Sequence, residues 1–230
     1  MKHYLLFFLA ALLNCNLFAQ TGQSIRVKAG EDVAQAYSPQ GFYRFPQFSN
    51  AALFFKGGGR NSGVRFNYNV LSGNMQFIGQ NGDTLDMVAA ASLDSIVFEK
   101  NVFLYNEGFM EVVAHSDSLK LLKKMIVRTQ VENIGAYGLP SATASIVNIK
   151  SISAGTGVYN LVINQDVVLS ENISWFIING NNKMIKANKA NLLKLLPAGK
   201  QTKAEAYLKQ NKTNFESEND LKKLIEAIAG

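Results

Sequence analysis

The regular spacing of turn residues between residues 51 and 130 constrains the fold of this chain most strongly. Short apolar or alternating segments recur there. Turn residues (Gly, Asn, Asp and Ser) separate them at intervals of about eight to twelve residues. Residues 64–70 alternate apolar and polar side chains with the period of a half-buried strand. Asn81-Gly82 favours a type I′ hairpin turn. The pattern predicts an antiparallel meander.

Three later segments extend this prediction. Residues 119–127 fit either a helical stripe or a strand, and β-branched Ile126, Val127 and Thr129 favour the strand. Residues 133–157 are rich in Gly and predict a loop region around one strand. Residues 158–168 and 174–178 predict a further hairpin, and the Asn-rich segment 179–182 predicts a turn into residues 183–186.

The pattern changes at Asn188, which can cap a helix that Pro197 and Gly199 end. A second short helix is expected around Tyr207. Ser217 and Asp220 resemble a capping box, and a third helix follows in which one apolar face recurs at i, i+3, i+4 and i+7, formed by Leu221, Leu224, Ile225 and Ile228.

The expected fold is therefore mainly β, an antiparallel meander of sandwich-like or open-barrel-like form with a short C-terminal helical segment. We expect a β domain over residues 20–186, with a sub-boundary near 133–157. Residues 187–230 are expected to form a basic α-helical tail, either packed on the β domain or appended to it.

The first 19 residues predict a secretory signal peptide. Met1-Lys2-His3 is a short positive start, residues 4–13 are apolar, and Ala19 supplies the small residue at the cut. The apolar run is too short to span a bilayer, which needs roughly 20 residues. Residues 12–15 are similar to a lipoprotein box, but Asn14 stands where a small residue is normal, so we expect Cys15 to be discarded. The expected location is the periplasm or the cell surface.

Removal of residues 1–19 limits the chemistry of the mature chain. It takes away the only cysteine, Cys15, and one of the two histidines, leaving His115. Thiolate zinc sites, cysteine nucleophiles and histidine-rich metal sites are then excluded. An acid–base pair of His115 with Asp117 is conceivable, but both flank a turn where polar residues are ordinary. We expect no catalytic, cofactor-binding or metal site, and a protein that is not an enzyme.

The positive charge lies in the tail alone. Residues 20–180 carry 12 Lys or Arg against 12 Asp or Glu, whereas residues 181–230 carry 10 Lys against 5 acidic residues. Such a segment is usually the solvated face of amphipathic helices, and it could also contact an anionic membrane or glycan peripherally. Export argues against a nucleic-acid partner, and an unknown protein or envelope partner is expected instead.

Three aspartates are followed by a hydroxyl residue and then an aliphatic one, in Asp83-Thr84-Leu85, Asp94-Ser95-Ile96 and Asp117-Ser118-Leu119. This pattern resembles the O-glycosylation signal of exported Bacteroidota proteins, which makes Thr84, Ser95 and Ser118 candidate sites. The same residues are also standard turn residues before apolar strands.

Residues 67–69 (Asn-Tyr-Asn), 73–78 (Gly-Asn-Met-Gln-Phe-Ile) and 82–85 (Gly-Asp-Thr-Leu) together resemble a hairpin signature of uncharacterised exported β-rich proteins of the Bacteroidota. The tail segments 192–197 and 208–212 are similar to the Lys/Leu-rich helical end of the same proteins. The resemblance implies lineage and export, and it brings no catalytic residues.

Two functional hypotheses remain open. The first is an exported, non-enzymatic envelope protein with a structural or partner-binding role. The second is a periplasmic carrier of an apolar ligand, such as a lipid, in a β-cavity. The Phe-rich and Tyr-rich strands permit the second, although a packed core uses the same residues.

Overall fold

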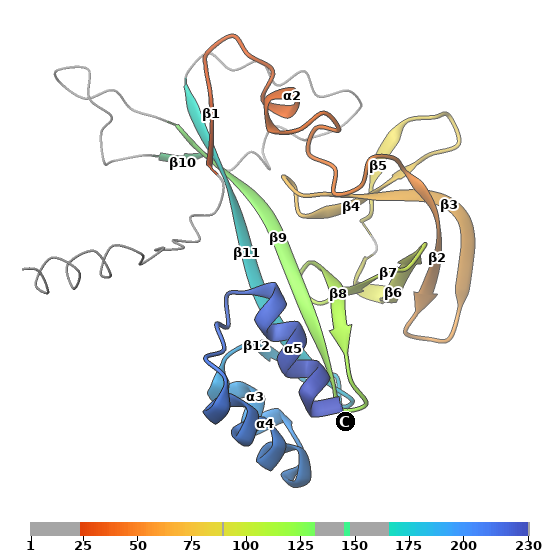
Figure 1. Cartoon of the computed structure of the whole chain (residues 1–230). Coiled ribbons are helices and arrows are strands. Elements are labelled where there is room, and N and C mark those ends of the chain that lie inside the picture. The colour runs from red at the N-terminus through yellow and green to blue at the C-terminus, as the bar shows by residue number, and fades with distance from the viewer. Residues whose placement is uncertain (1–23, 89, 132–144, 148–165, 230) are drawn as a thin grey trace, which may run out of the picture.

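Figure 1 shows the computed structural model of the chain, which describes residues 24–88, 90–131, 145–147 and 166–229. The strands form an antiparallel sheet that is open rather than closed, and three helices follow it near the C-terminus. The predicted mainly β fold with a C-terminal helical segment is confirmed. The predicted signal peptide, and the 133–157 region apart from residues 145–147, lie outside the described residues.

Seven short strands make up the first part of the sheet. They are β2 (Ser49–Phe55), β3 (Arg60–Asn69), β4 (Asn74–Ile78), β5 (Thr84–Asp86), β6 (Leu93–Phe98), β7 (Asn101–Tyr105) and β8 (Phe109–His115). β2 pairs with both β3 and β6. β3, β4 and β5 therefore extend the sheet on one side of β2, and β6, β7 and β8 extend it on the other. The predicted meander is present as two meanders joined along β2 and β6.

Two long strands connect this part to the rest of the molecule. β9 (Leu119–Val131) and β11 (Val167–Asn179) are each 13 residues long and pair along their whole length. β8 and β12 (Met184–Lys186) flank one end of the pair, and β1 (Ser24–Val27) and β10 (Ser145–Val147) flank the other. β9 confirms that residues 119–127 form a strand.

β11 corrects one prediction. Residues 167–179 form one continuous strand, so the hairpin predicted between 158–168 and 174–178 is wrong where the structure describes it; residues 158–165 lie outside the described part. Ser170, Glu171 and Asn172 look like turn residues, yet they lie inside the ladder with β9. The Glu171 carboxylate accepts a hydrogen bond from the Tyr37 hydroxyl (2.8 Å), so a long-range partner satisfies this polar group within the strand.

Aromatic side chains fill the first of the cores. The rings of Phe98 and Phe103 stack with centroids 5.5 Å apart, and Phe45 meets Phe98 edge-on at 5.0 Å. Phe45 belongs to the aromatic segment 41–48, which packs against the core before β2 begins. A short helix, α2 (Val33–Tyr37), precedes it and was not predicted; the Asp32 side chain caps it by accepting from two backbone N–H groups.

The helices cover one face of the lower half of the β9–β11 pair (Figure 1). They are α3 (Lys189–Leu195), α4 (Ala198–Gln210) and α5 (Glu218–Ala229), close to the predicted positions. Asn188 caps α3 as predicted, since its side-chain oxygen accepts from the Asn191 N–H at 2.9 Å. The predicted apolar face of α5 is buried and packs with Trp175 in a second core.

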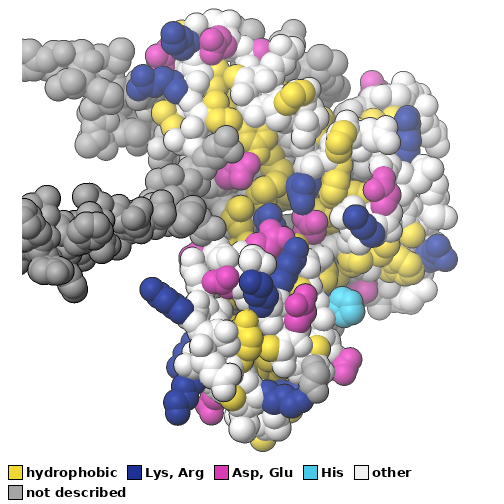
Figure 2. Space-filling model, in the orientation of Figure 1, with side chains coloured by type: hydrophobic (Ala, Val, Ile, Leu, Met, Phe, Trp, Pro, Cys, Tyr) yellow, Lys and Arg dark blue, Asp and Glu magenta, His cyan; other side chains and the backbone are white. Residues whose placement is uncertain are grey.

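The lysines of the helical segment mostly face the solvent. Figure 2 shows dark blue side chains on its outer face, with acidic side chains among them. Lys200 and Lys222 are engaged instead: the first donates to the carbonyl groups that end α5, and the second pairs with Glu218. This is the amphipathic arrangement expected from the sequence.

Among the helices in the described ranges, none is long and apolar enough to cross a membrane.

Candidate functional site

A pocket of about 420 Å³ lies where the second meander meets the lower end of the β9–β11 pair. We call it the polar pocket. Leu104, Ile178 and Met184 belong to one apolar cluster and are among its lining residues, and we call them its apolar floor. Its polar side chains come from several strands and turns that are far apart in the sequence, and they include Lys56, Asp94, Asn106, Asp117, Lys120 and Asn182.

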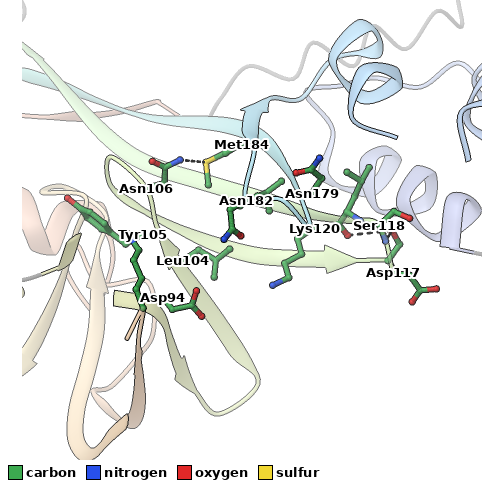
Figure 3. Close-up of a pocket in the computed structure, with 15 residues that line it drawn as sticks. Asp94, Leu104, Tyr105, Asn106, Asp117, Ser118, Lys120, Asn179, Asn182 and Met184 are labelled. Carbon is green, nitrogen blue, oxygen red and sulfur yellow. Dashed lines mark hydrogen bonds between the residues drawn. The ribbon is translucent and has the colours of Figure 1, made fainter. Parts of the chain in front are cut away.

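Three of these polar groups converge in the middle of the polar pocket. Figure 3 shows the amide of Asn182, the ammonium of Lys120 and the carboxylate of Asp94 directed toward the space around Leu104. Asp117 points away from that centre. In the part of the chain that the structure describes, the side chains of Lys120 and Asn182 have no hydrogen-bond or ion-pair partner. The convergent groups are therefore available to a ligand.

A rigid turn presents Asn182. The side-chain oxygen of Asn179 accepts from the backbone N–H groups of Asn181 (3.2 Å) and Lys183 (3.1 Å). The N–H of Asn182 donates to the Asn179 carbonyl at 3.0 Å. Asn182 itself has a φ of 56°, a left-handed conformation that Asn tolerates better than most residues. The Asn-rich run 179–182 thus forms the predicted turn and also fixes the direction of Asn182.

A second turn positions the other side of the polar pocket. The Ser116 N–H donates to the Leu119 carbonyl at 2.7 Å, and the Ser116 hydroxyl accepts from the Leu119 N–H at 3.2 Å. These bonds close the turn between β8 and β9, and Lys120 follows directly on β9. Lys56 enters from the end of β2, and its ammonium donates to the Ala91 carbonyl at 2.9 Å.

The charges of the polar pocket cancel. Lys56 and Lys120 carry two positive charges, and Asp94 and Asp117 carry two negative charges. Asp94 also accepts a long hydrogen bond of 3.4 Å from the neighbouring Ser95 hydroxyl. The polar pocket therefore has no net charge that would select an anion or a cation.

A second pocket of about 320 Å³ lies between α2 and the β9–β11 pair, and its charged groups are already paired. Tyr37 donates to Glu171, and Lys123 pairs with Glu218 at 2.9 Å. Burial, reinforced by the hydrogen bond to Glu171, raises the pKa of Tyr37 above its usual value. These groups are satisfied within the protein, so this pocket offers a ligand less than the polar pocket does.

The sequence-predicted site residues are only partly brought together. Thr84 begins β5 at one edge of the sheet, Ser95 lies in β6, and Ser118 lies in the β8–β9 turn, all partly exposed. Ser118, and the aspartate that precedes Ser95, line the polar pocket, whereas Thr84 does not. Glycosylation of these residues stays a prediction from the sequence.

His115 and Asp117 do not form a shared site. His115 ends β8 opposite Lys120 and is exposed, and it is not among the residues that line the polar pocket. The described residues contain no group of three or more His, Cys, Asp or Glu side chains placed to hold a metal ion.

Sequence reasoning missed most of the polar pocket. Lys56, Leu104 and Lys120 are far apart in the chain and meet only because β2, β7 and β9 lie in one sheet. The local signals were the polar run 179–182, which predicts only a turn, and the triplets that contain Asp94 and Ser118, which predict glycosylation and not a pocket.

No protein-family model matches this chain, and neither a curated protein nor a solved structure is significantly similar to it. The resemblance to exported proteins of the Bacteroidota therefore stays a prediction from the sequence.

Proposed function

We propose that this protein is exported to the cell envelope and binds a partner there through the polar pocket, without catalysing a reaction. One observation carries the proposal. Lys120 and Asn182 project into the polar pocket from strand and turn positions, and within the described residues neither side chain has a hydrogen-bond or ion-pair partner. Polar side chains that extend from a fixed backbone and make no hydrogen bond within the described residues can bond to a ligand without first breaking a bond inside the protein.

Export is supported by the sequence of the N-terminus. A positive start, an apolar run and Ala19 before Gln20 form the pattern of a cleaved signal. The proposed location is the periplasm or the cell surface, and the proposed source is a member of the Bacteroidota. O-glycosylation of Thr84, Ser95 or Ser118 belongs to the same proposal.

We propose that the protein is not an enzyme because few residues suited to catalysis remain in the mature chain. After signal cleavage the chain keeps one histidine and no cysteine. His115 lies outside the polar pocket, whose carboxylates Asp94 and Asp117 point in different directions (Figure 3). In glycoside hydrolysis, for example, the two catalytic carboxylates flank the bond that is cleaved. The different directions of Asp94 and Asp117 therefore support binding better than acid–base chemistry of that kind.

The carrier hypothesis has no comparable observation in its favour. An apolar carrier needs aromatic or aliphatic side chains that line a cavity. In the first core Phe45, Phe98 and Phe103 contact one another instead. Tyr68 packs on Phe103 as well, and its hydroxyl donates to the Met125 carbonyl at 2.8 Å.

Two measurements test the proposal. The full chain, expressed in a Gram-negative host, is fractionated and its N-terminus sequenced; we expect an envelope protein that begins at Gln20. A photo-reactive amino acid placed at Asn182 should then crosslink to an envelope component in intact cells. The same amino acid at Asn181, which is exposed beside the polar pocket but does not line it, is the matched control. A cytoplasmic chain, or equal crosslinking at both positions, contradicts the proposal.

A further inference from the structure

We propose that the ligand of the polar pocket is a neutral saccharide. This inference rests on the proposed function, since it names the chemical class that the same pocket recognises. It is argued from the charge balance, the hydrogen-bonding groups and the apolar floor of the polar pocket.

The charge balance disfavours ions. Asp94 and Lys120 both face the space around Leu104, and they form no ion pair with each other (Figure 3). A phosphate group near Lys120 would also meet the carboxylate of Asp94, and an ammonium group near Asp94 would meet Lys120. A ligand with one full charge thus gains from one side chain and loses from the other.

Hydroxyl groups gain from both side chains. A hydroxyl donates one hydrogen bond and accepts others, so it can donate to Asp94 while it accepts from Lys120. The Asn182 amide has both a donor and an acceptor, which suits a pair of neighbouring hydroxyls on a sugar ring. Three such groups around one point match a ligand with several hydroxyls close together.

The floor and the size of the polar pocket fit the rest of a sugar. Leu104, Ile178 and Met184 offer an apolar surface to the C–H face of a ring. The volume of about 420 Å³ falls within the usual range of small-ligand sites, roughly 300–1,000 Å³. A lining with both polar groups and an apolar surface is complementary to a molecule whose edge carries hydroxyls and whose face does not.

The Asn182→Gly variant gives a clean test. Gly adopts the left-handed φ of 56° without strain, so the turn is kept and only the amide is removed. Asn181→Gly is the matched control, because Asn181 lies in the same turn, is exposed and does not line the polar pocket. A second test variant is Lys120→Gln, which removes the ammonium group from the polar pocket. Its matched control is Lys183→Gln, because Lys183 is exposed and does not line the polar pocket.

The probes are maltose, cellobiose, mannobiose and chitobiose, with a neutral-glycan array for wider coverage, and glycylglycine and inorganic phosphate as charged comparisons. They are titrated into the isotope-labelled full chain and followed by NMR. We expect at least one neutral saccharide to shift the amide signals of Asn106, Ser118 and Asn182. Its affinity should fall about tenfold in Asn182→Gly and in Lys120→Gln, and stay unchanged in the control variants.

Several outcomes overturn the inference: no neutral saccharide binds, binding is unaffected by Asn182→Gly and Lys120→Gln, or only glycylglycine or phosphate shifts these signals. The proposed function fails separately. If a crosslinked envelope partner depends on position 182 and contains no glycan, partner binding stands and the saccharide is wrong. If a saccharide binds a chain that stays in the cytoplasm, the envelope role is wrong and the saccharide site stands.

Discussion

The side-chain amide of Gln76 donates a hydrogen bond of 2.7 Å to the carboxylate of Asp86, across the pairing of β4 with β5. Gln76 is almost completely buried, and its amide oxygen accepts from Tyr43 (2.9 Å) and Asn69 (3.2 Å). One buried amide therefore joins the edge strand, the hairpin and the aromatic segment before β2. Every polar atom of this amide has a partner, which is the condition for burying it at low cost.

Asp86→Ala should destabilise the protein by about 1–3 kcal/mol, because it leaves the buried amide nitrogen of Gln76 without an acceptor. Urea denaturation followed by circular dichroism measures the loss. Asp83→Ala is the control, since Asp83 is exposed in the adjacent turn and only its main-chain carbonyl is used. Equal losses of stability in the two variants would show that the Gln76–Asp86 hydrogen bond does not stabilise the fold.

Asn67→Asp should lower the free energy of unfolding by more than Asp86→Ala does, by above about 3 kcal/mol. The reason is that it replaces a hydrogen-bond donor by a buried negative charge. The Asn67 amide nitrogen donates to the carbonyls of Phe45 (2.9 Å) and Gln47 (3.2 Å), and the side chain is 1% exposed. A carboxylate would repel both carbonyl oxygens and detach the aromatic segment. Asn61→Asp makes the same chemical change at an exposed position of β3 and should be nearly neutral. Differential scanning calorimetry of the pair decides; similar melting temperatures would contradict the role given to Asn67.

These buried amides show which features of the β3–β5 region can be predicted from the sequence and which cannot. Alternation and turn residues located β3, β4 and the hairpin between β4 and β5, because those signals are local. From the same signals, Asn67, Asn69 and Gln76 are predicted only to be polar positions in strands, and not to be buried. Their burial depends on the aromatic segment 41–48, which packs over them through long-range contacts that a periodic pattern does not contain.

The same distinction applies to β11 and to the polar pocket. Ser170, Glu171 and Asn172 interrupt an apolar pattern, so the local pattern predicts two strands where the structure has one. Pairing with β9 and the hydrogen bond from Tyr37 keep β11 continuous. The α5 face was predictable because Leu221 and its neighbours repeat at helical spacing within one segment. The polar pocket was not, because Lys56 and Asn182 come together only when distant strands join one sheet.

Lys200→Met should destabilise the helical segment by about 1 kcal/mol. The Lys200 ammonium donates to the carbonyls of Ile228 (2.8 Å) and Ala229 (3.1 Å), so a residue of α4 satisfies the C-terminal end of α5. Its positive charge also complements the negative end of the α5 dipole. Lys203→Met, at an exposed position of the same helix, is the matched control and should leave the melting temperature unchanged. Hydrogen exchange should show faster opening of the last turn of α5 in Lys200→Met alone; unchanged exchange there would rule out the capping role.

The stability of the helix–sheet contact should depend on pH through Glu218. Burial alone would raise the pKa of this carboxyl group, but hydrogen bonds from Lys222 (2.7 Å) and Lys123 (2.9 Å) outweigh it and lower the pKa below the usual value near 4.5. The carboxylate therefore stabilises the fold fully above that pH. The contribution is lost as the pH falls through the lowered folded-state value.

Glu218→Gln should accordingly cost about 0.5–1 kcal/mol at pH 7, a modest amount because water screens a carboxyl group that is 35% exposed. The difference from the unmodified chain should shrink toward zero in strongly acidic solution, where Glu218 is protonated in both the folded and the unfolded states. Glu226→Gln, at an exposed position of α5, should show no such pH dependence. Urea denaturation of the three proteins across this pH range measures the effect. A difference for Glu218→Gln that persists when the carboxyl is protonated would mean that the charge of Glu218 does not hold α5 against β9.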